Sequence, residues 1–379
     1  MKNKENTIPK GWQIKTIDQV CYNLDNLRVP ISKDKRIKGS IPYYGATGVL
    51  DYVSEYIFDE ELLLIGEDGA DWSKFAESAY LVKGKSWVNN HAHVLKCKKI
   101  NQVYLKEYLN YKDLNLYITG GTRGKLTKGI LSKIPVAVPT PEEQKKIAEI
   151  LSCVDEDIEK TDEMIKKTQK LKKGLMQEFF AKNKENYTKI ADLAEVFTGG
   201  TPNTTRKEYW GGGIKWMSSG EVNLRRVYDT KKTITQEGLD NSNARLLPTG
   251  TVMVALAGQG KTRGKAALLE VESTCNQSLA AIIAHPVALN NEFLFFNFEY
   301  RYEELRNISG GEGRAGLNLR IIKDILIPVP NMLEQKKIVG ILSAVDDKIN
   351  IYKQIKRKLT ELKKGLMQDL LSGEIRVKI

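Results

Sequence analysis

The sequence predicts a mixed α+β protein built as two copies of one unit, in which a globular α/β domain is followed by a long helix. A segment in the middle of the chain recurs near its end, and both copies have the apolar spacing of paired helices. The regions before them contain short apolar runs separated by glycine-rich turns. We therefore expect two α/β domains joined by a pair of long antiparallel coiled-coil helices with pseudo-two-fold symmetry.

The composition is typical of a soluble protein with two domains. The chain has 379 residues, of which 41% are hydrophobic and 28% charged. Its apolar runs are too short to span a bilayer and its first residues lack a secretion signal, so a cytoplasmic location is expected. Four scattered cysteines fit a reducing compartment and favour neither a disulfide framework nor a zinc site. They are Cys21, Cys97, Cys153 and Cys275.

The charge balance favours a polyanionic partner. Lysine and arginine number 59 against 47 acidic residues, for a net charge of +12. The excess is spread along the chain rather than gathered in a basic tail. We therefore expect a folded surface to carry out any recognition.

An internal duplication is the most informative feature. Glu143–Ile147 recurs as Glu334–Ile338, and Leu171–Gln177 recurs as Leu362–Gln368 at the same offset of 191 residues. Across 142–180 and 333–371, 19 of the 39 aligned positions are identical. The preceding domains are much less alike, which suggests two different targets and one shared kind of partner. The domains are divided as 1–141, 142–182, 183–332 and 333–379.

Each repeated segment carries the start signals and apolar spacing of a long helix. Pro141 and the acidic residues after it suit a first turn, and Ser372-Gly373 suits a helix end. The apolar positions three and four residues apart predict a seam at Ile338, Ile341, Val345, Ile349, Tyr352, Ile355, Leu359, Leu362, Leu366 and Leu370. The first helix repeats this seam at Ile147, Ile150, Val154, Ile158, Thr161, Met164, Thr168, Leu171, Leu175 and Phe179.

The second helix is expected to run back along the first, which brings the tail 374–379 near the first domain. The alternatives are that each helix packs on its own domain or that the helices pair between molecules. The residues expected in the helix pair or at a partner subunit are Gln144, Ile147, Leu151, Leu171, Leu175, Gln335, Ile338, Leu342, Leu362 and Leu366.

Glycine-rich loops at the ends of strand-like runs are the candidate DNA contacts. Glycine lets a backbone approach a ligand closely, glutamine can pair with adenine, and arginine can pair with guanine. The loops are 43–48, 120–125, 258–264 and 310–318, and any one of them alone could be an ordinary turn. They supply Tyr43, Tyr44, Thr47, Arg123, Lys125, Gln259, Lys261, Thr262, Arg263, Arg314 and Asn318 as candidate DNA-binding residues.

Patterns of catalysis and metal binding are incomplete. Gly260-Lys261-Thr262 resembles the end of a phosphate-binding loop, but Ala255 stands where that loop needs glycine. The combination of His91, His93 and Cys97 lacks a fourth zinc ligand. An acidic group at 67–71 lacks the lysines of a nuclease. We therefore expect no catalysis, no metal and no cofactor in this chain, and a separate chain to act as the enzyme.

Two motifs carry a resemblance to a known family over essentially the whole chain. A proline followed by Glu-Gln-x-x-Ile opens each helix, in 139–147 and 330–338, and Leu-x-x-Gly-Leu-Met-Gln lies near each helix end. The chain resembles the specificity subunits of type I restriction-modification systems. The segments 197–202, 216–221 and 276–278 follow the family pattern, whereas Tyr22–Asp25 replaces the Gly-Gly-Thr-Pro start in the first domain.

The resemblance implies that each domain is a target recognition domain reading one half of a bipartite double-stranded DNA sequence. It implies that the helices set the spacer and dock two methyltransferase subunits, which carry S-adenosylmethionine and methylate adenine. Two restriction subunits, using ATP and Mg²⁺, can join. It also adds Trp216, Ser218 and Ser219 to the candidate DNA contacts. The alternatives are a coiled-coil protein scaffold with two binding lobes and no sequence-specific DNA reading, and a nuclease in its own right.

Overall fold

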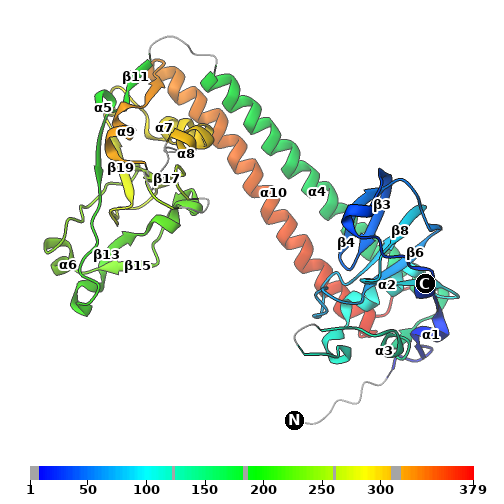
Figure 1. Ribbon diagram of the computed structural model, residues 1–379. Helices are drawn as coiled ribbons and strands as arrows, with labels where there is room; N and C mark the ends of the chain where they lie inside the picture. Colours follow the sequence, from blue (N-terminus) through cyan, green and yellow to red (C-terminus); the bar gives the residue numbers. More distant parts are fainter. Residues whose placement is uncertain (1–7, 122–123, 182–186, 259–261, 309–316) are drawn as a thin grey trace. The chain divides into compact units, whose positions relative to one another are not determined.

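The computed structural model describes residues 8–121, 124–181, 187–258, 262–308 and 317–379 (Figure 1). They form two compact units, each containing one globular domain and part of both long helices. Unit 1 comprises residues 1–163 and 353–379, and unit 2 comprises residues 164–352. The four-part division of the chain and the pseudo-two-fold relation of its halves stay predictions.

The two expected long helices are present. They are α4 (Pro141–Ala181) and α10 (Met332–Ser372), each of 41 residues. The Asn331 side chain accepts a hydrogen bond from the Glu334 backbone N–H at 3.0 Å, which caps the start of α10. Gly373 follows the end of α10 with a positive φ of 76°. Within the described ranges, no helix combines the length and apolar character needed to cross a membrane.

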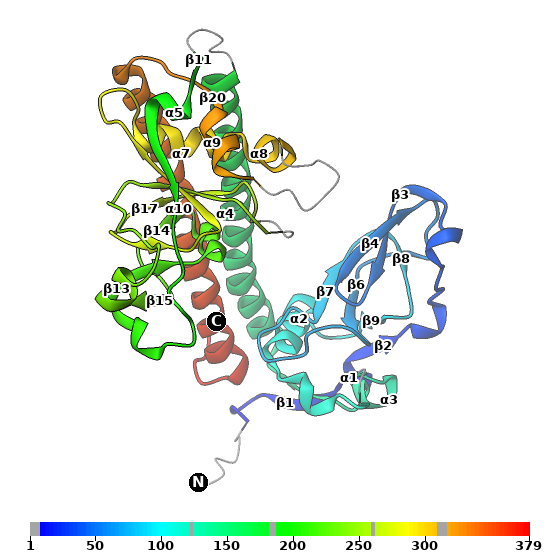
Figure 2. The same cartoon turned by 60° about the vertical axis from the view of Figure 1, so that its left-hand side comes forward.

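The globular part of unit 1 contains two four-stranded sheets, ordered β2-β9-β6-β7 and β4-β3-β8-β5, and a β1-β10 pair (Figure 2). The strands are β1 (Gln13–Thr16), β2 (Cys21–Asn23), β3 (Lys38–Gly45), β4 (Gly48–Val53), β5 (Phe58–Asp59), β6 (Leu62–Gly66), β7 (Ala79–Val82), β8 (Lys85–Val88), β9 (Ala92–Cys97) and β10 (Pro135–Val138). The helices are α1 (Ile17–Val20), α2 (Gln102–Tyr111) and α3 (Lys128–Leu131), with 3-10 turns η1 (Asp25–Leu27), η2 (Lys33–Lys35) and η3 (Leu114–Tyr117).

The globular part of unit 2 has sheets ordered β12-β19-β16-β17-β14 and β15-β13-β18, and a β11-β20 pair. The strands are β11 (Tyr187–Lys189), β12 (Ala194–Thr198), β13 (Trp210–Met217), β14 (Arg226–Val227), β15 (Lys232–Ile234), β16 (Val252–Ala255), β17 (Ala266–Leu269), β18 (Thr274–Cys275), β19 (Leu279–Ala284) and β20 (Leu326–Pro328). The helices are α5 (Ile190–Leu193), α6 (Gln236–Asp240), α7 (Asn291–Tyr300), α8 (Tyr302–Ile308) and α9 (Leu319–Asp324), with 3-10 turns η4 (Lys207–Tyr209) and η5 (Ser219–Leu224).

The two globular parts share one topology. The order β2-β9-β6-β7 in unit 1 matches β12-β19-β16-β17 in unit 2. In the second sheet, β3 pairs antiparallel with β4 and parallel with β8, as β13 does with β15 and β18. The duplication inferred from the helices therefore extends to the domains, although their sequences have diverged. The mixed α+β fold class is confirmed.

Each long helix contributes one end to each hydrophobic core. In unit 1, Ile147 and Leu151 of α4 and Met367 and Leu370 of α10 are buried in the core that contains Tyr104. In unit 2, the core combines Ile338 and Leu342 of α10 with Met176 and Phe180 of α4. The expectation that the second helix runs back to the first domain is confirmed, because the end of α10 lies in unit 1. The alternative, in which each helix packs on its own domain, is also partly realised, since each helix begins on the domain that precedes it.

Ion pairs between α4 and α10 show the relative direction of the two helices. In unit 1, Asp155 pairs with Lys363 at 2.6 Å and Asp162 pairs with Lys356 at 2.7 Å. In unit 2, Lys172 pairs with Asp346 at 2.8 Å. The α10 residue number falls as the α4 residue number rises, so the helices are antiparallel, as predicted.

The predicted apolar seam is wrong at four positions in its middle. Met164, Leu171, Ile355 and Leu362 are between 40% and 55% exposed. Among the buried positions on α4, Thr161 and Thr168 belong to the predicted seam, whereas Lys172 does not. Each threonine hydroxyl donates to the backbone carbonyl four residues earlier at 2.7 Å, so it is satisfied without a partner helix. Leu171 and Leu362, which were predicted to lie in the helix pair or at a partner subunit, are thus more than half exposed, because threonines and ion pairs occupy the buried face.

Candidate nucleic-acid interface

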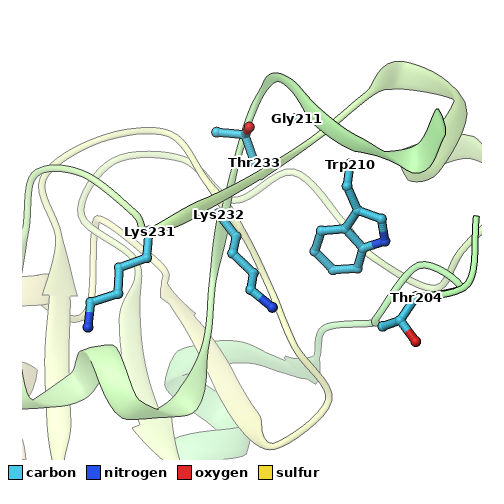
Figure 3. A pocket seen from close by; sticks show the side chains of 6 residues that line it. All are labelled: Thr204, Trp210, Gly211, Lys231, Lys232 and Thr233. Atoms are coloured by element: carbon cyan, nitrogen blue, oxygen red, sulfur yellow. The ribbon is translucent and has the colours of Figure 1, made fainter. Parts of the chain in front are cut away.

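A basic cavity of about 410 Å³ lies beside the antiparallel strands β13 and β15 of unit 2 (Figure 3). The register of this strand pair shifts between Trp210 and Ile214, so that a bulge forms at the glycines 211–213. Gly211 has a φ of 81°, and a Cβ at Gly212 would lie 2.5 Å from the Ile234 carbonyl oxygen. Only glycine fits this backbone without strain. The cavity is lined by Thr204, Trp210, Gly211, Lys231, Lys232 and Thr233.

The cavity combines an aromatic face with two cations. The Lys232 ammonium lies 5.4 Å from the centre of the Trp210 ring, and the Trp210 and Trp216 rings pack in a T-shaped arrangement with their centroids 5.0 Å apart. The indole N–H of Trp216 donates to the Gly200 carbonyl at 2.9 Å. Lys231 and Lys232 are exposed, and neither has a salt bridge to an acidic side chain among the described residues. Such cations can bind phosphate oxygens, and an indole can stack on a base or sugar.

In unit 2, the predicted DNA-binding residues do not converge on this cavity. Trp216 is buried and holds Trp210 in place. Ser218 donates to Glu221 at 2.7 Å and directly precedes η5, whose first residue, Ser219, is half-buried. Arg263 donates to the Arg306 carbonyl at 3.2 Å, and Asn318 caps α9 by accepting from the Ile321 N–H at 3.0 Å. Thr262 is half-buried. Gln259, Lys261 and Arg314 lie outside the described residues.

In unit 1, the predicted DNA-binding residues also lie in different structural surroundings. Tyr43 is buried, its hydroxyl accepts from the Ile31 N–H at 3.0 Å, and the Arg36 guanidinium covers its ring at 4.3 Å. Tyr44 packs against Tyr80, and Thr47 is exposed in the β3–β4 turn. Tyr43 and Trp216 thus act as internal supports, because their large apolar rings are removed from water. Arg123 lies outside the described residues.

Lys125, whose side chain is 48% exposed, lies at the edge of an ion-pair network in unit 1. Its ammonium pairs with Glu67 at 2.8 Å, and Arg28 pairs with the other oxygen of Glu67 at 2.6 Å. The His93 ring contacts Asp25 through Nδ1 at 2.6 Å and the Leu126 carbonyl through Nε2 at 2.6 Å. Both partners are hydrogen-bond acceptors, so each ring nitrogen of His93 faces an oxygen atom.

Opposite charges keep the carboxylates of this network ionised. Burial raises the pKa of Asp25, but hydrogen bonds from His93, Val94 and Asn23 outweigh it and lower that pKa below its usual value. The pKa of Glu67 is lowered by Lys125 and Arg28 against the same opposing effect of burial. Potential metal-ligand atoms of Asp25, Glu67 and His93 lie within 4.8 Å of one another. Since Arg28 and Lys125 already neutralise Glu67, we interpret the cluster as an ion-pair network.

The repeated glutamines join the start of each long helix to its domain. The Gln144 side chain accepts from the Asn101 N–H at 2.8 Å and donates to the Pro139 carbonyl at 2.9 Å. Gln335 makes equivalent bonds, accepting from the Asn290 N–H at 2.8 Å and donating to the Pro330 carbonyl at 2.8 Å. Both glutamines are buried. The Glu-Gln motif thus fixes the helix start within each unit.

A four-residue charge cluster lies where the helices meet in each unit, and the sequence reasoning missed it. In unit 2, Lys172 bridges Glu299 at 2.7 Å and Asp346 at 2.8 Å, and Arg225 bridges the same acids at 2.5 and 2.9 Å. Burial raises the pKa of Asp346, but Arg225 and Lys172 lower it overall. The sequence did contain a signal for this cluster, because Lys172 and Asp346 both stand at positions that are identical in the two copies of the repeat.

The cluster of unit 1 uses the repeat equivalents. Lys363 pairs with Asp155 at 2.6 Å and with Glu107 at 3.2 Å, and Lys106 contacts the same two acids. Lys172 and Lys363 are one repeat apart, as are Asp155 and Asp346. In each unit the domain adds one more acid and one more cation. Each cluster therefore ties both long helices to one domain.

The chain is similar to one family of proteins along most of its length. A family model described as the type I restriction modification DNA specificity domain matches residues 9–167 and again 182–361. A putative type I restriction enzyme specificity subunit of Haemophilus influenzae is 27% identical over 92% of this chain and 93% of its own length. The MjaVIII specificity subunit of Methanocaldococcus jannaschii is 23% identical over 98% of this chain and 94% of its own length.

Solved structures show the same fold. The S subunit of a type I restriction-modification system from M. genitalium has a TM-score of 0.66 at 14% identity, covering 100% of this chain and 99% of that one. A chain from a study of complex assembly and conformational transition of the type I R-M system has a TM-score of 0.60 at 13% identity, covering 97% and 100%.

Proposed function

The chain belongs to the type I restriction modification DNA specificity family, and from this premise we propose that it is the DNA-reading specificity subunit of a type I restriction-modification complex. The observation that carries the proposal is the pair of family matches, one on each of two domains that share a topology. The sequences of the two domains have diverged, so each would read a different half of a bipartite site.

The long helices would set the spacer between the half-sites and dock two methyltransferase subunits. Met164 and Leu171 are exposed on α4, and their repeat equivalents Ile355 and Leu362 are exposed on α10. Exposed apolar side chains at equivalent positions fit two copies of one partner. Each methyltransferase subunit would carry S-adenosylmethionine and methylate adenine. Restriction subunits using ATP and Mg²⁺ would cleave the DNA. The chain itself would be non-catalytic and act in the cytoplasm.

Exchange of one domain tests this assignment directly. Residues 183–332 would be replaced by the corresponding segment of another specificity subunit and expressed with a methyltransferase partner. We expect a methylation map of the host DNA to show one bipartite motif, in which only one half changes. The unchanged chain serves as the control. A map without a motif, or with both halves altered, would contradict the proposal.

The cavity beside β13 and β15 predicts a salt-dependent contribution to DNA binding. In the double variant Lys231→Gln/Lys232→Gln, the slope of log affinity against log salt should fall by about one for each lysine that contacts a phosphate. Affinity should fall on every DNA sequence alike, because phosphate contacts carry no base information. Lys160→Gln, on the exposed face of α4, is the matched control. A wild-type affinity that does not vary with salt would favour the protein-scaffold alternative.

A further inference from the structure

Two cysteines of unit 1 face each other across neighbouring strands. Cys21 on β2 is the register partner of Cys97 on the antiparallel strand β9, and the two sulfur atoms are 4.0 Å apart. The Lys98 N–H donates to the Val20 carbonyl and the Leu24 N–H donates to the Val94 carbonyl, each at 2.8 Å. The pairs Val20/Lys98 and Leu24/Val94 are thus hydrogen-bonded, and they lie one and three positions from the cysteine pair along the two strands.

The ladder places the cysteines at a position where a disulfide can form. Hydrogen-bonded and non-hydrogen-bonded pairs alternate along antiparallel strands, so the pair Cys21/Cys97 is non-hydrogen-bonded. Directly opposed residues of that kind have Cα atoms about 4.5 Å apart, within the range of about 4.4–6.8 Å that disulfides span. A bond therefore needs rotation of the two side chains and little movement of the backbone.

We propose that Cys21 and Cys97 are a reversible modification site that closes to a disulfide by exchange with a small-molecule disulfide. Cys97 would be the entry point, because its side chain is partly exposed whereas Cys21 is buried against the core of unit 1. A hydrogen bond from Cys21 lowers the pKa of Cys97, while the same contact and burial raise that of Cys21. The accessible thiol is thus also the one that ionises more readily.

The exchange proceeds in two balanced steps. The Cys97 thiolate attacks one sulfur of the external disulfide, forming a mixed disulfide and releasing one thiolate. Cys21 gives its proton to that thiolate and attacks the Cys97 sulfur, which forms the protein disulfide and expels the second thiolate. The second thiolate takes up the proton that Cys97 lost on ionising. The two protein thiols are oxidised, and the external disulfide is reduced to two thiols.

The bond would close a long loop of the domain. Cys21 and Cys97 are 76 positions apart, and β6 and β7 lie in the sequence between them. A link across such a loop restricts the unfolded chain more than the folded one. The oxidised chain should therefore have a higher melting temperature than the reduced chain.

The full chain would be incubated with oxidised glutathione and digested without reduction. We expect a peptide pair joining Cys21 to Cys97, lighter than the two thiol peptides by two hydrogen atoms, and a rise in Tm of several degrees. Dithiothreitol should reverse both effects. Cys21→Ala should stop at the mixed disulfide on Cys97 and gain no stability.

Cys153→Ser and Cys275→Ser are the matched controls, and the cross-link should form in both. The proposal is overturned if both thiols stay reduced at excess oxidised glutathione. It is equally overturned if the wild-type chain stops at glutathionylated Cys97, or if Cys21 or Cys97 links instead to another cysteine. None of these measurements depends on DNA binding.

Discussion

Replacing Asp346 by alanine is expected to lower the free energy of unfolding by about 3–5 kcal/mol. The side chains of Asp346 and Lys172 are only 10% and 11% exposed. Without Asp346, Lys172 and Arg225 would share the single remaining carboxylate of Glu299. A buried cation without sufficient counter-charge is costly because the interior solvates it poorly. Urea unfolding with linear extrapolation measures the loss.

The neighbouring Asp347→Ala is the matched control, because Asp347 is exposed and should change stability by less than about 0.5 kcal/mol. The double variant Lys172→Met/Asp346→Leu should recover much of the loss, since it removes an opposite pair and fills the space with apolar groups. Equal stability of Asp346→Ala and Asp347→Ala would show that the cluster does not hold the helices to the domain.

The same cluster gives unfolding a pH dependence. The folded-state pKa of Asp346 is lowered, so its contribution is fully present above the unfolded pKa of about 4 and is lost as the pH falls through the folded value. Stability of the wild type should therefore decline in acid more steeply than that of Asp346→Asn. The two curves are compared by urea unfolding between neutral pH and acid.

Substitution of His93 by leucine should also lower the free energy of unfolding by about 3–5 kcal/mol. The Asp25 carboxylate would lose its 2.6 Å contact with His93 and keep the longer contact with Arg28 at 3.6 Å, while its side chain stays 5% exposed. The Leu126 carbonyl would lose its imidazole hydrogen bond as well. Urea unfolding of the wild type and of His93→Leu measures this difference in the free energy of unfolding.

His91→Leu provides the comparison, because the His91 side chain is 50% exposed and its pair with Asp68 is screened by water. We expect that variant to lie within about 1 kcal/mol of the wild type. If His93→Leu were no less stable than His91→Leu, the ion-pair network would have no structural role. Asp25→Asn should lie between the two, since it keeps an acceptor for His93 but removes the charge.

Part of the candidate site could be predicted from the sequence, and part could not. Glycine-rich loops pointed to Tyr43 and Lys125, but Tyr43 is buried and Lys125 is held by Glu67. Trp210, Lys231 and Lys232 were not singled out, because they are separated along the chain and meet only when β13 pairs with β15. The register that brings them together includes a bulge, which no periodic pattern records.

The sequence by itself determined the duplication, the two long helices and their antiparallel direction. These follow from identities at one constant offset and from local signals at the helix ends, which depend on neighbours in the chain. Only the tertiary structure decided which helix face is buried, because an apolar side chain such as Leu171 satisfies the spacing rule whether it faces a partner or solvent. It alone also joined Lys172 to Asp346, His93 to Asp25 and Cys21 to Cys97. Contacts between distant residues depend on how the elements pack, and local periodicity carries no information about that packing.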